Sequence, residues 1–507
     1  MQTTVSGLIA GHDDGSKALG SPTADWLSYG GLRALTSDVR TALHGFGIGR
    51  GNRVAIVLPN GPEMAAAFIT IAQVAVTAPL NPAYREEEYV FYLDDLKAKA
   101  LVVMADDEGP AVAAAGTLGI KVIRVTVPDG APAGTITLTS EASGEADTTA
   151  PGPEDVALIL HTSGTTSRPK IVPLLHSNVA ASAEHIRVSL DLTPADRCMN
   201  VMPLFHIHGL IAAVSASLAA GASVWCAPGF DALRFFGSLR QAKPTWYTAV
   251  PTMHQAILTR ASRNEEIIKE VPLRFLRSSS ASLPAQVMQA LAETFGAPVI
   301  EGYGMTEAAH QMASNPLPPR AQKPGAVGVE AGPKVRIAHE TEDRLIEGTG
   351  EVVISGPNVT PGYESNPEAN AKSFFEAEDA RWFRTGDQGA FDSDGYLHLT
   401  GRLKEIINRG GEKISPLEVD GVLLDHPAIA QVVTFALPHP KLGEEVAAAV
   451  VLKGEASERD IRDFAKERMA DFKVPRKIII LDEIPKGATG KMQRIGMAEK
   501  LGLVEKV

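Results

Sequence analysis

Residues 161–170 read HTSGTTSRPK and directly follow an apolar run, 156–160, that is typical of a buried strand. Backbone N–H groups, hydroxyls and one ammonium in such a loop can surround a polyphosphate. Composition alone would also fit a flexible linker, and the glycine is not followed by the Gly-Lys-Ser/Thr of a Walker A loop. The position after a strand favours phosphate binding, by Thr162, Ser163, Gly164, Thr165, Thr166 and Lys170.

Apolar runs alternate with helical patterns on both sides of this loop. Strands that alternate with helices indicate a layered α/β body. One uncharged run, Cys198–Phe230, is long enough to span a bilayer, but Pro, His, Gly and Ser interrupt it. That run therefore predicts a strand, a loop, an alanine-rich helix and a second strand inside a protein core, and no membrane span. The other predicted elements are a helix at 63–76 and strands at 53–58, 100–104, 122–127, 156–160, 246–250 and 298–300.

The pattern of predicted elements and of charged residues changes twice toward the C-terminus. Short strands at 334–338, 351–355 and 396–399 predict a small antiparallel β unit. The last 104 residues hold 17 basic and 17 acidic side chains, so the net charge of −12 falls entirely in the preceding part. A charge-rich, balanced segment is typical of a small separate domain. The predicted domains are 1–403 and 404–507, in an α/β fold with a small α+β C-terminal unit.

The overall composition limits the class of protein. The 507 residues are 44% hydrophobic and 21% charged, an ordinary globular mixture. An acidic chain gives no reason to expect a nucleic-acid partner. Two cysteines, Cys198 and Cys226, exclude a disulfide framework and favour a reducing compartment such as the cytoplasm. Met1–Leu19 lacks the pattern of a secretory signal, and the last residues lack the peroxisomal Ser-Lys-Leu.

Five further motifs follow the hydroxyl-rich loop in a fixed order. They are Pro203–His206 (PLFH), Gly302–Glu307 (GYGMTE), Trp382–Asp387 (WFRTGD), Gly401–Glu405 (GRLKE) and Pro485–Lys491 (PKGATGK). With these motifs the chain resembles the adenylate-forming superfamily of acyl-CoA synthetases, peptide-synthetase adenylation domains and luciferases. The resemblance implies a large N-terminal domain and a mobile C-terminal domain. It also implies that a carboxylate attacks the α-phosphate of MgATP and that the thiol of CoA then displaces AMP.

The resemblance assigns roles to single residues. Lys491 would stabilise the crowded α-phosphate, a task suited to a cation on a flexible stem. Glu307 would hold Mg²⁺, although a glutamate at a helix start fits the sequence as well. Lys404 would be the hinge of the C-terminal domain, and Arg409, Gly410 and Gly411 would face CoA, where an ordinary Gly-Gly turn is the alternative. Adenine and ribose would contact Ser280, Ala281, Glu301, Gly302, Tyr303, Thr306, Asp387 and Arg402.

A closer resemblance concerns the carboxylate substrate. The segments 246–255, 277–283, 306–318 and 408–416 look like those of the oxalate–CoA ligases of plants and fungi. Oxalate has two carboxylates and no apolar tail, so its distal carboxylate needs donors in a buried site. We expect His208, Ser280 and His310 to bind that carboxylate, and His206 to lie between the carboxylate and the thiol. Each histidine could instead satisfy only backbone groups.

Other interpretations stay open beside oxalate. The alternative substrate is another small, aromatic or medium-chain carboxylate, and a nucleotide sensor without turnover is the alternative class. Zinc at the pair His206 and His208 is disfavoured because no cysteine or acidic ligand follows at metal spacing. Ile171 stands where the family usually has glycine, so a left-handed backbone after Lys170 is disfavoured.

Overall fold

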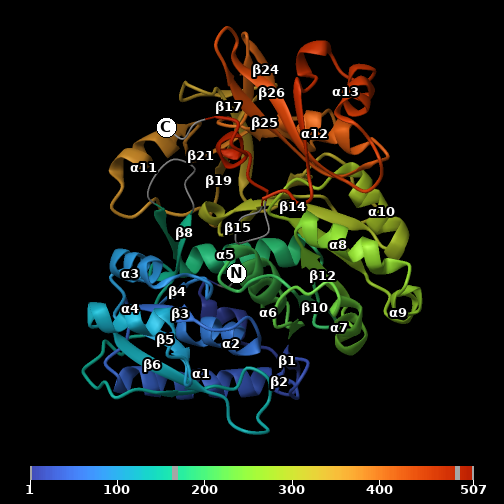
Figure 1. Cartoon of the computed structure of the whole chain (residues 1–507). Helices are drawn as coiled ribbons and strands as arrows, with labels where there is room; N and C mark the ends of the chain where they lie inside the picture. Colours follow the sequence, from blue (N-terminus) through green and yellow to red (C-terminus); the bar gives the residue numbers. More distant parts are fainter. Residues whose placement is uncertain (1–2, 163–168, 486–491, 505–507) are drawn as a thin grey trace.

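The structure, a computed structural model, describes residues 3–162, 169–485 and 492–504. Figure 1 shows the chain running from a blue layer of helices and strands at the bottom to the red C-terminal region at the top. The strands within the described residues form four sheets. The large N-terminal part holds three of them and the smaller C-terminal part holds one, so the predicted α/β class is confirmed.

The first sheet has seven strands in the order β7-β6-β5-β3-β4-β8-β9. Its central strands are parallel, whereas β7 and β9 pair antiparallel at the two edges. Central strands of this kind are buried on both faces and therefore consist of nearly continuous apolar runs. The strands are β3 (Arg53–Val57), β4 (Val76–Pro79), β5 (Ala100–Met104), β6 (Lys121–Thr126), β7 (Thr137–Thr139), β8 (Val156–Thr162) and β9 (Lys170–Leu175).

The second sheet has nine strands in the order β16-β15-β14-β13-β12-β10-β11-β1-β2. The six strands from β14 to β1 are parallel, and the strands at both edges are antiparallel. The strands are β1 (Lys17–Gly20), β2 (Leu27–Ser28), β10 (Arg197–Asn200), β11 (Ser223–Cys226), β12 (Trp246–Ala249), β13 (Phe275–Ser279), β14 (Val299–Met305), β15 (His310–Ser314) and β16 (Val329–Glu330).

Helices fill the space between these two sheets and cover their outer faces. The largest buried cluster contains side chains from both sheets and from α1, α2 and α5. The interior helices are η1 (Val5–Leu8), α1 (Tyr29–Gly45), α2 (Pro62–Ile71), α5 (His176–Ser189), the π-helix η2 (His208–Ser215) and α6 (Ala216–Ala219). The outer helices are α3 (Glu86–Asp95) and α4 (Pro110–Leu118) on the first sheet, and α7 (Phe235–Ala242), α8 (Pro251–Ala261), α9 (Glu265–Glu270) and α10 (Ala285–Phe295) on the second.

Two smaller sheets complete the molecule. The six-stranded antiparallel sheet is the β unit predicted from the sequence, and α11 (Pro367–Ser373) precedes its strand β20. Its strands are β17 (Lys334–Ala338), β18 (Leu345–Ile346), β19 (Gly350–Ser355), β20 (Phe374–Ala377), β21 (Ala380–Phe391) and β22 (Leu397–Arg402); the 3₁₀ turn η3 (Thr306–Ala308) lies earlier in the chain, after β14.

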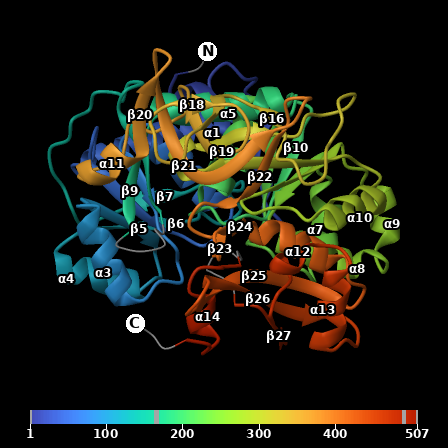
Figure 2. The same cartoon turned by 90° about the horizontal axis from the view of Figure 1, so that it is seen from above.

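The last sheet has five strands and its own buried cores. Seen from above, it lies beside β22 and near α10 and α8 (Figure 2). Gln286 of α10 donates to the Gly421 carbonyl at 3.5 Å, which places the two parts in contact. The elements are β23 (Ile407–Arg409), β24 (Glu412–Ile414), α12 (Pro416–Leu424), β25 (Ile429–His439), β26 (Gly443–Leu452), α13 (Glu458–Lys466), η4 (Asp471–Lys473), β27 (Lys477–Leu481) and α14 (Met497–Lys500).

The uncharged run from residue 198 to residue 230 has the predicted structure. It forms β10, a loop, the helical segment η2–α6 and β11, all inside the protein. Among residues 3–162, 169–485 and 492–504, no helix is long and apolar enough to cross a membrane. Cys198 and Cys226 are buried and form no disulfide with each other.

Candidate functional site

The site lies where parallel strands of the nine-stranded sheet end. In such sheets ligands bind outside the carboxyl ends of the strands. The end of β13 leads into Ser280, which has a left-handed backbone with φ of 74°. The adjacent β14 carries Gly302 and Tyr303, and the Ser279 hydroxyl donates to the Gly302 carbonyl at 2.6 Å. Ala281 is exposed, and Thr306 is half-buried in η3 directly after β14.

Asp387 connects β14 of the nine-stranded sheet to the small β unit. The Tyr303 hydroxyl donates to Asp387 Oδ2, and Arg402 Nε lies 3.3 Å from Asp387 Oδ1. Asp387 and Arg402 are direct partners across β21 and β22. Burial and the nearby Asp387 raise the pKa of Tyr303, so its hydroxyl remains a donor. Three residues predicted to hold adenine and ribose therefore meet at one point.

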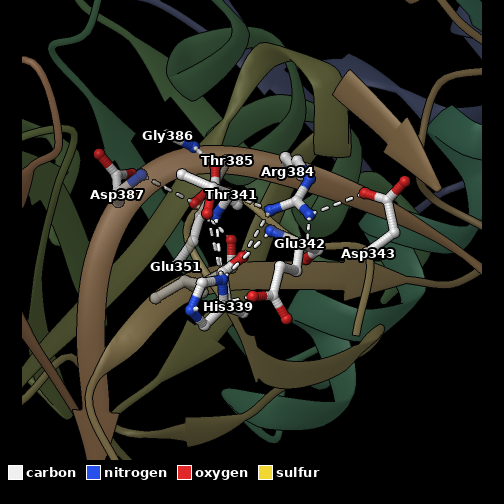
Figure 3. Close-up of polar contacts among 10 residues, drawn as sticks. His339, Thr341, Glu342, Asp343, Glu351, Arg384, Thr385, Gly386 and Asp387 are labelled. Carbon is white, nitrogen blue, oxygen red and sulfur yellow. Dashed lines mark hydrogen bonds and ion pairs between the residues drawn. The ribbon is translucent and has the colours of Figure 1, made fainter. Parts of the chain in front are cut away.

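A buried ion pair supports the turn that carries Asp387 (Figure 3). Arg384 Nη1 donates to Glu351 Oε2 at 2.6 Å, and the other oxygen, Oε1, accepts from the Gly386 N–H at 3.0 Å. The two side chains are only 11% and 6% exposed. Gly386 has φ of 75°, and the Asp387 N–H donates to the Thr385 hydroxyl at 3.1 Å. Glu351 thus anchors the backbone one residue before Asp387.

Glu307 lies close to Lys170, the lysine at the end of the hydroxyl-rich loop. The Tyr363 hydroxyl donates to Glu307 Oε1 at 2.8 Å, and Lys170 Nζ lies 4.2 Å from the centre of the Tyr363 ring. Burial raises the pKa of Glu307, and the cations Lys170 and Arg402 oppose the rise. Burial and Lys404 lower the pKa of Lys170, whereas Glu307 raises it. The Glu307 carboxylate and the Lys170 ammonium thus lie near each other in surroundings that are partly shielded from water.

These residues fit a magnesium ion that is shared with phosphates. Mg²⁺ binds through one or two carboxylates and substrate oxygens rather than through an all-protein cage. Glu307 offers one buried carboxylate, of which Oε2 is not the oxygen that Tyr363 contacts. In the part of the chain that the structure describes, no group of three or more His, Cys, Asp or Glu side chains could hold a metal alone. Zinc at His206 and His208 gains no support.

The predicted acyl-binding residues come together beside this point. His208, the first residue of η2, places Nδ1 3.0 Å from the Ser280 hydroxyl and Nε2 2.6 Å from the Thr248 hydroxyl. The rings of His208 and His310 lie 5.2 Å apart, and both side chains are fully buried. His206 is half-buried, and its Nδ1 accepts from the His208 N–H at 3.4 Å. These side chains therefore form a polar cluster, which we call the acyl wall.

The backbone at this wall is strained. Ser280, Ala309 and His310 all have positive φ, at 74°, 46° and 106°. Such conformations cost of order 1–3 kcal/mol for residues with a Cβ and are concentrated at binding and active sites. The fold therefore holds two of the three predicted carboxylate-binding side chains, Ser280 and His310, in conformations that local preference opposes.

Comparison with known proteins decides the family. The model of the AMP-binding enzyme family matches residues 11–364, and that of the AMP-binding enzyme C-terminal domain matches residues 418–491. The chain belongs to the AMP-binding enzymes. The predicted membership of the adenylate-forming superfamily is confirmed.

Relatives of this AMP-binding enzyme cover most of the chain. The oxalate–CoA ligase of Arabidopsis thaliana is 47% identical over 461 residues, covering 88% of each chain. The oxalate–CoA ligase of Saccharomyces cerevisiae is 41% identical over 498 residues, covering 93% of this chain and 90% of its own. Among solved structures, ATP-bound MatB from Rhodopseudomonas palustris superimposes with a TM-score of 0.89 at 28% identity, covering all of both chains.

Of the predicted phosphate-binding residues of this AMP-binding enzyme, the structure describes Thr162 and Lys170. Ser163, Gly164, Thr165, Thr166 and Lys491 are outside the described residues. Thr162 and Lys170 pair across β8 and β9, so they frame the segment between them. Ile171 is a buried strand residue, which explains how an isoleucine fits there.

The predicted CoA-facing turn has its own internal partners. Arg409 Nε lies 2.5 Å from Glu445 Oε1, and this pair neutralises the guanidinium. Gly410 and Gly411 have φ of 62° and 96°, as required for the tight turn between β23 and β24. Lys404 is exposed in the link between β22 and β23. The backbone thus forms a tight Gly-Gly turn, which both the predicted approach to CoA and the ordinary-turn alternative include.

Glu301 has a different side-chain environment from its neighbours. Its carboxylate accepts from the Leu283 N–H at 2.9 Å, and burial raises its pKa to about 8. Its backbone, which the sequence prediction assigned to the adenine wall, pairs with Ser278 in the sheet. Sequence reasoning missed Tyr363, Glu351 and Arg277. Only Arg277 had a local signal, because it is a charged residue that directly follows the apolar pair Phe275-Leu276 of β13.

Proposed function

We propose that this protein joins oxalate to coenzyme A through an oxalyl-adenylate, releasing AMP and pyrophosphate. The observation that carries the proposal is the polar acyl wall formed by His208, Ser280 and His310 next to the Tyr303–Asp387 contact. A pocket for a fatty or aromatic acid would instead be lined by apolar side chains. The two oxalate–CoA ligases at 41–47% identity support the same substrate.

The first half-reaction requires two anions to be brought together. Asp387 would accept from the ribose hydroxyls, while Arg402 and Lys170 face the phosphates. Glu307 would hold Mg²⁺, which supplies charge neutralisation to the phosphates when bound. An oxalate oxygen attacks the α-phosphorus, the bond to the β-phosphate oxygen breaks, and pyrophosphate leaves. Lys491 would stabilise the charge on the α-phosphate as it becomes five-coordinate.

In the second half-reaction the thiolate sulfur of CoA attacks the oxalyl carbonyl carbon. The carbon–oxygen bond to phosphate breaks, and AMP leaves with the bonding electrons. We propose that the domains divide between residues 403 and 404 and that Lys404 is the hinge. Arg409, Gly410 and Gly411 would then approach CoA, and this requires the Arg409–Glu445 pair to move or to open. The two free thiols support a cytoplasmic location.

A panel of acids tests the substrate. Purified protein is incubated with ATP, Mg²⁺, CoA and one acid at a time: oxalate, malonate, acetate, benzoate or octanoate, and AMP is measured. We expect oxalate to give the highest kcat/KM. No AMP with oxalate would refute the proposal, and a preference for benzoate or octanoate would favour the aromatic or medium-chain alternative.

Two variants test the assigned roles. Lys491→Ala should abolish oxalate-dependent pyrophosphate exchange, whereas Lys500→Ala, an exposed lysine nearby in sequence, is the matched control and should retain it. His310→Ala should raise the KM for oxalate at least tenfold and change the KM for ATP by less than twofold. Equal changes in both KM values would show that His310 does not bind the acid specifically.

A further inference from the structure

Arg277 is a fully buried arginine behind the acyl wall. It lies on β13, between Thr248 of β12 and Ile300 of β14 in the register of the sheet. Among residues 3–162, 169–485 and 492–504, no carboxylate forms an ion pair with its guanidinium, and Nε has no hydrogen-bond partner. A buried charge without a counter-ion is costly. A protein can retain such a buried charge where the charge helps to bind or orient a ligand.

One side of the guanidinium is held by Gln311. Arg277 Nη2 lies 3.3 Å from Gln311 Oε1. The Gln311 amide nitrogen donates to the Ser189 hydroxyl at 2.8 Å and to the Ala331 carbonyl at 3.0 Å, so its oxygen must face Arg277. This neutral oxygen fixes the position of the guanidinium but leaves its positive charge uncompensated.

The other side of the guanidinium contacts His208. Arg277 Nη1 lies 3.4 Å from His208 Nε2, and a guanidinium can only donate. The same Nε2 lies 2.6 Å from the Thr248 hydroxyl, which can also donate. With Nε2 as the acceptor for these donors, the ring proton of a neutral His208 resides on Nδ1. That N–H is directed at the Ser280 hydroxyl oxygen, 3.0 Å away. Ser280 then accepts from His208 and keeps its own hydrogen for a group in the pocket.

The sheet leaves room for this guanidinium only because residue 302 is glycine. A Cβ on Gly302 would lie 2.6 Å from Arg277 Nη2 and 3.1 Å from its Cζ. The glycine that sequence analysis placed at the adenine therefore also admits a cation beneath the acyl wall. The arrangement connects β14, β13 and η2 in one rigid unit.

We propose that Arg277 is a positioning residue that fixes the donor direction of His208 and Ser280 and makes the pocket selective for an acid with a second anionic group. The inference rests on the proposed oxalate function and deepens it. A monocarboxylate leaves the positive charge behind the wall unmatched, whereas the distal carboxylate of a dianion faces both the Ser280 hydrogen and the field of Arg277.

The test compares Arg277→Met with Arg277→Lys and with Arg274→Gln as the control. Methionine keeps the volume but removes the charge, and lysine keeps the charge. Arg274 is a nearby arginine whose guanidinium is paired with Asp196 at 3.0 Å, outside the pocket. For each protein we measure the KM for oxalate, the KM for ATP and the thermal unfolding temperature.

For Arg277→Met we expect the KM for oxalate to rise about 10- to 100-fold and the KM for ATP to stay within twofold. The unfolding temperature should stay equal or rise, because a buried unpaired charge is replaced by an apolar side chain. Arg277→Lys should recover most of the oxalate affinity. Arg274→Gln should lower the unfolding temperature without separating the two KM values.

Two results would overturn the inference. An unchanged KM for oxalate in Arg277→Met would show that the charge does not act on the acid. A large fall in unfolding temperature with parallel losses for oxalate and ATP would show a purely structural arginine. Wild-type protein that forms no AMP from oxalate would overturn the proposed function itself, and the inference with it; an active wild type therefore separates the two failures.

Discussion

Replacing Glu351 by glutamine tests whether the turn before Asp387 depends on a buried charge. Glu351 accepts from Arg384 at 2.6 Å and from the Gly386 N–H at 3.0 Å while only 6% of its side chain is exposed. The amide of glutamine has one oxygen, so it can keep one of these two bonds. The other bond is lost or faced by an amide N–H that repels the donor.

The cost can be estimated from the remaining partners of Arg384. Breaking a buried ion pair costs about 3–5 kcal/mol when the remaining charge has no other partner. Arg384 keeps the carbonyls of His339 and Glu342 at 3.0 and 2.7 Å and the carboxylate of Asp343 at 2.9 Å. We therefore expect a lower loss, about 2–3 kcal/mol of unfolding free energy. Misplacement of Asp387 should raise the KM for ATP about fivefold or more.

Thermal unfolding and pyrophosphate exchange at varied ATP measure these two effects. The matched control is Glu340→Gln, which removes a carboxylate of the same β unit that is 29% exposed and pairs with the exposed Lys413 at 2.6 Å. An exposed pair contributes about 0–1 kcal/mol, so this variant should change little. Equal behaviour of the two variants would refute the role assigned to Glu351.

Three further predictions follow from single contacts. Tyr363→Phe removes the donor to Glu307 and should require about 3- to 10-fold more Mg²⁺ for half-maximal adenylation, measured by pyrophosphate exchange; an unchanged Mg²⁺ dependence would contradict this. Glu301 has a folded pKa of about 8, above its unfolded value, so its neutral form stabilises at low pH and this stabilisation is lost as the pH rises to about 8. Glu301→Gln should therefore unfold at a higher temperature than wild type at pH 8.5 and at nearly the same temperature at pH 4.5; a pH-independent difference would count against it. Gly302→Ala should destabilise by about 1–3 kcal/mol and raise the KM for oxalate, because the new methyl group overlaps the Arg277 guanidinium; wild-type unfolding and KM would show that the guanidinium moves freely.

Local patterns were sufficient to predict several strands of the fold. The run Ala100–Met104 is strand β5 from its first residue to its last, and Lys334–Ala338 is β17. Short runs rich in apolar and β-branched side chains indicate a strand by themselves, without information from the rest of the chain. Sheet membership was not predictable in this way. Leu19 pairs with Val224 across more than two hundred residues, and nothing near Leu19 in the sequence indicates that partner.

The site was predictable where a motif carries several functional residues together. Tyr303 and Glu307 lie within one motif, and the structure brings both close to Asp387 and Arg402. The supporting residues come from ordinary stretches: Tyr363 lies in the loop between β19 and α11 and contacts Glu307 only through the fold. A tyrosine of that kind has no local pattern that separates it from a core tyrosine, so only the three-dimensional structure identifies it.

The π-helix that begins at His208 has a consequence for how such pockets diversify. A π-turn holds one residue more than an α-helical turn. Deleting a single residue from 209–215 would return the segment to α-helical winding and rotate His208 by about 100° away from Ser280 and Thr248. A one-codon deletion or insertion could therefore exchange the side chain that faces the acid while leaving the nucleotide-binding strands untouched.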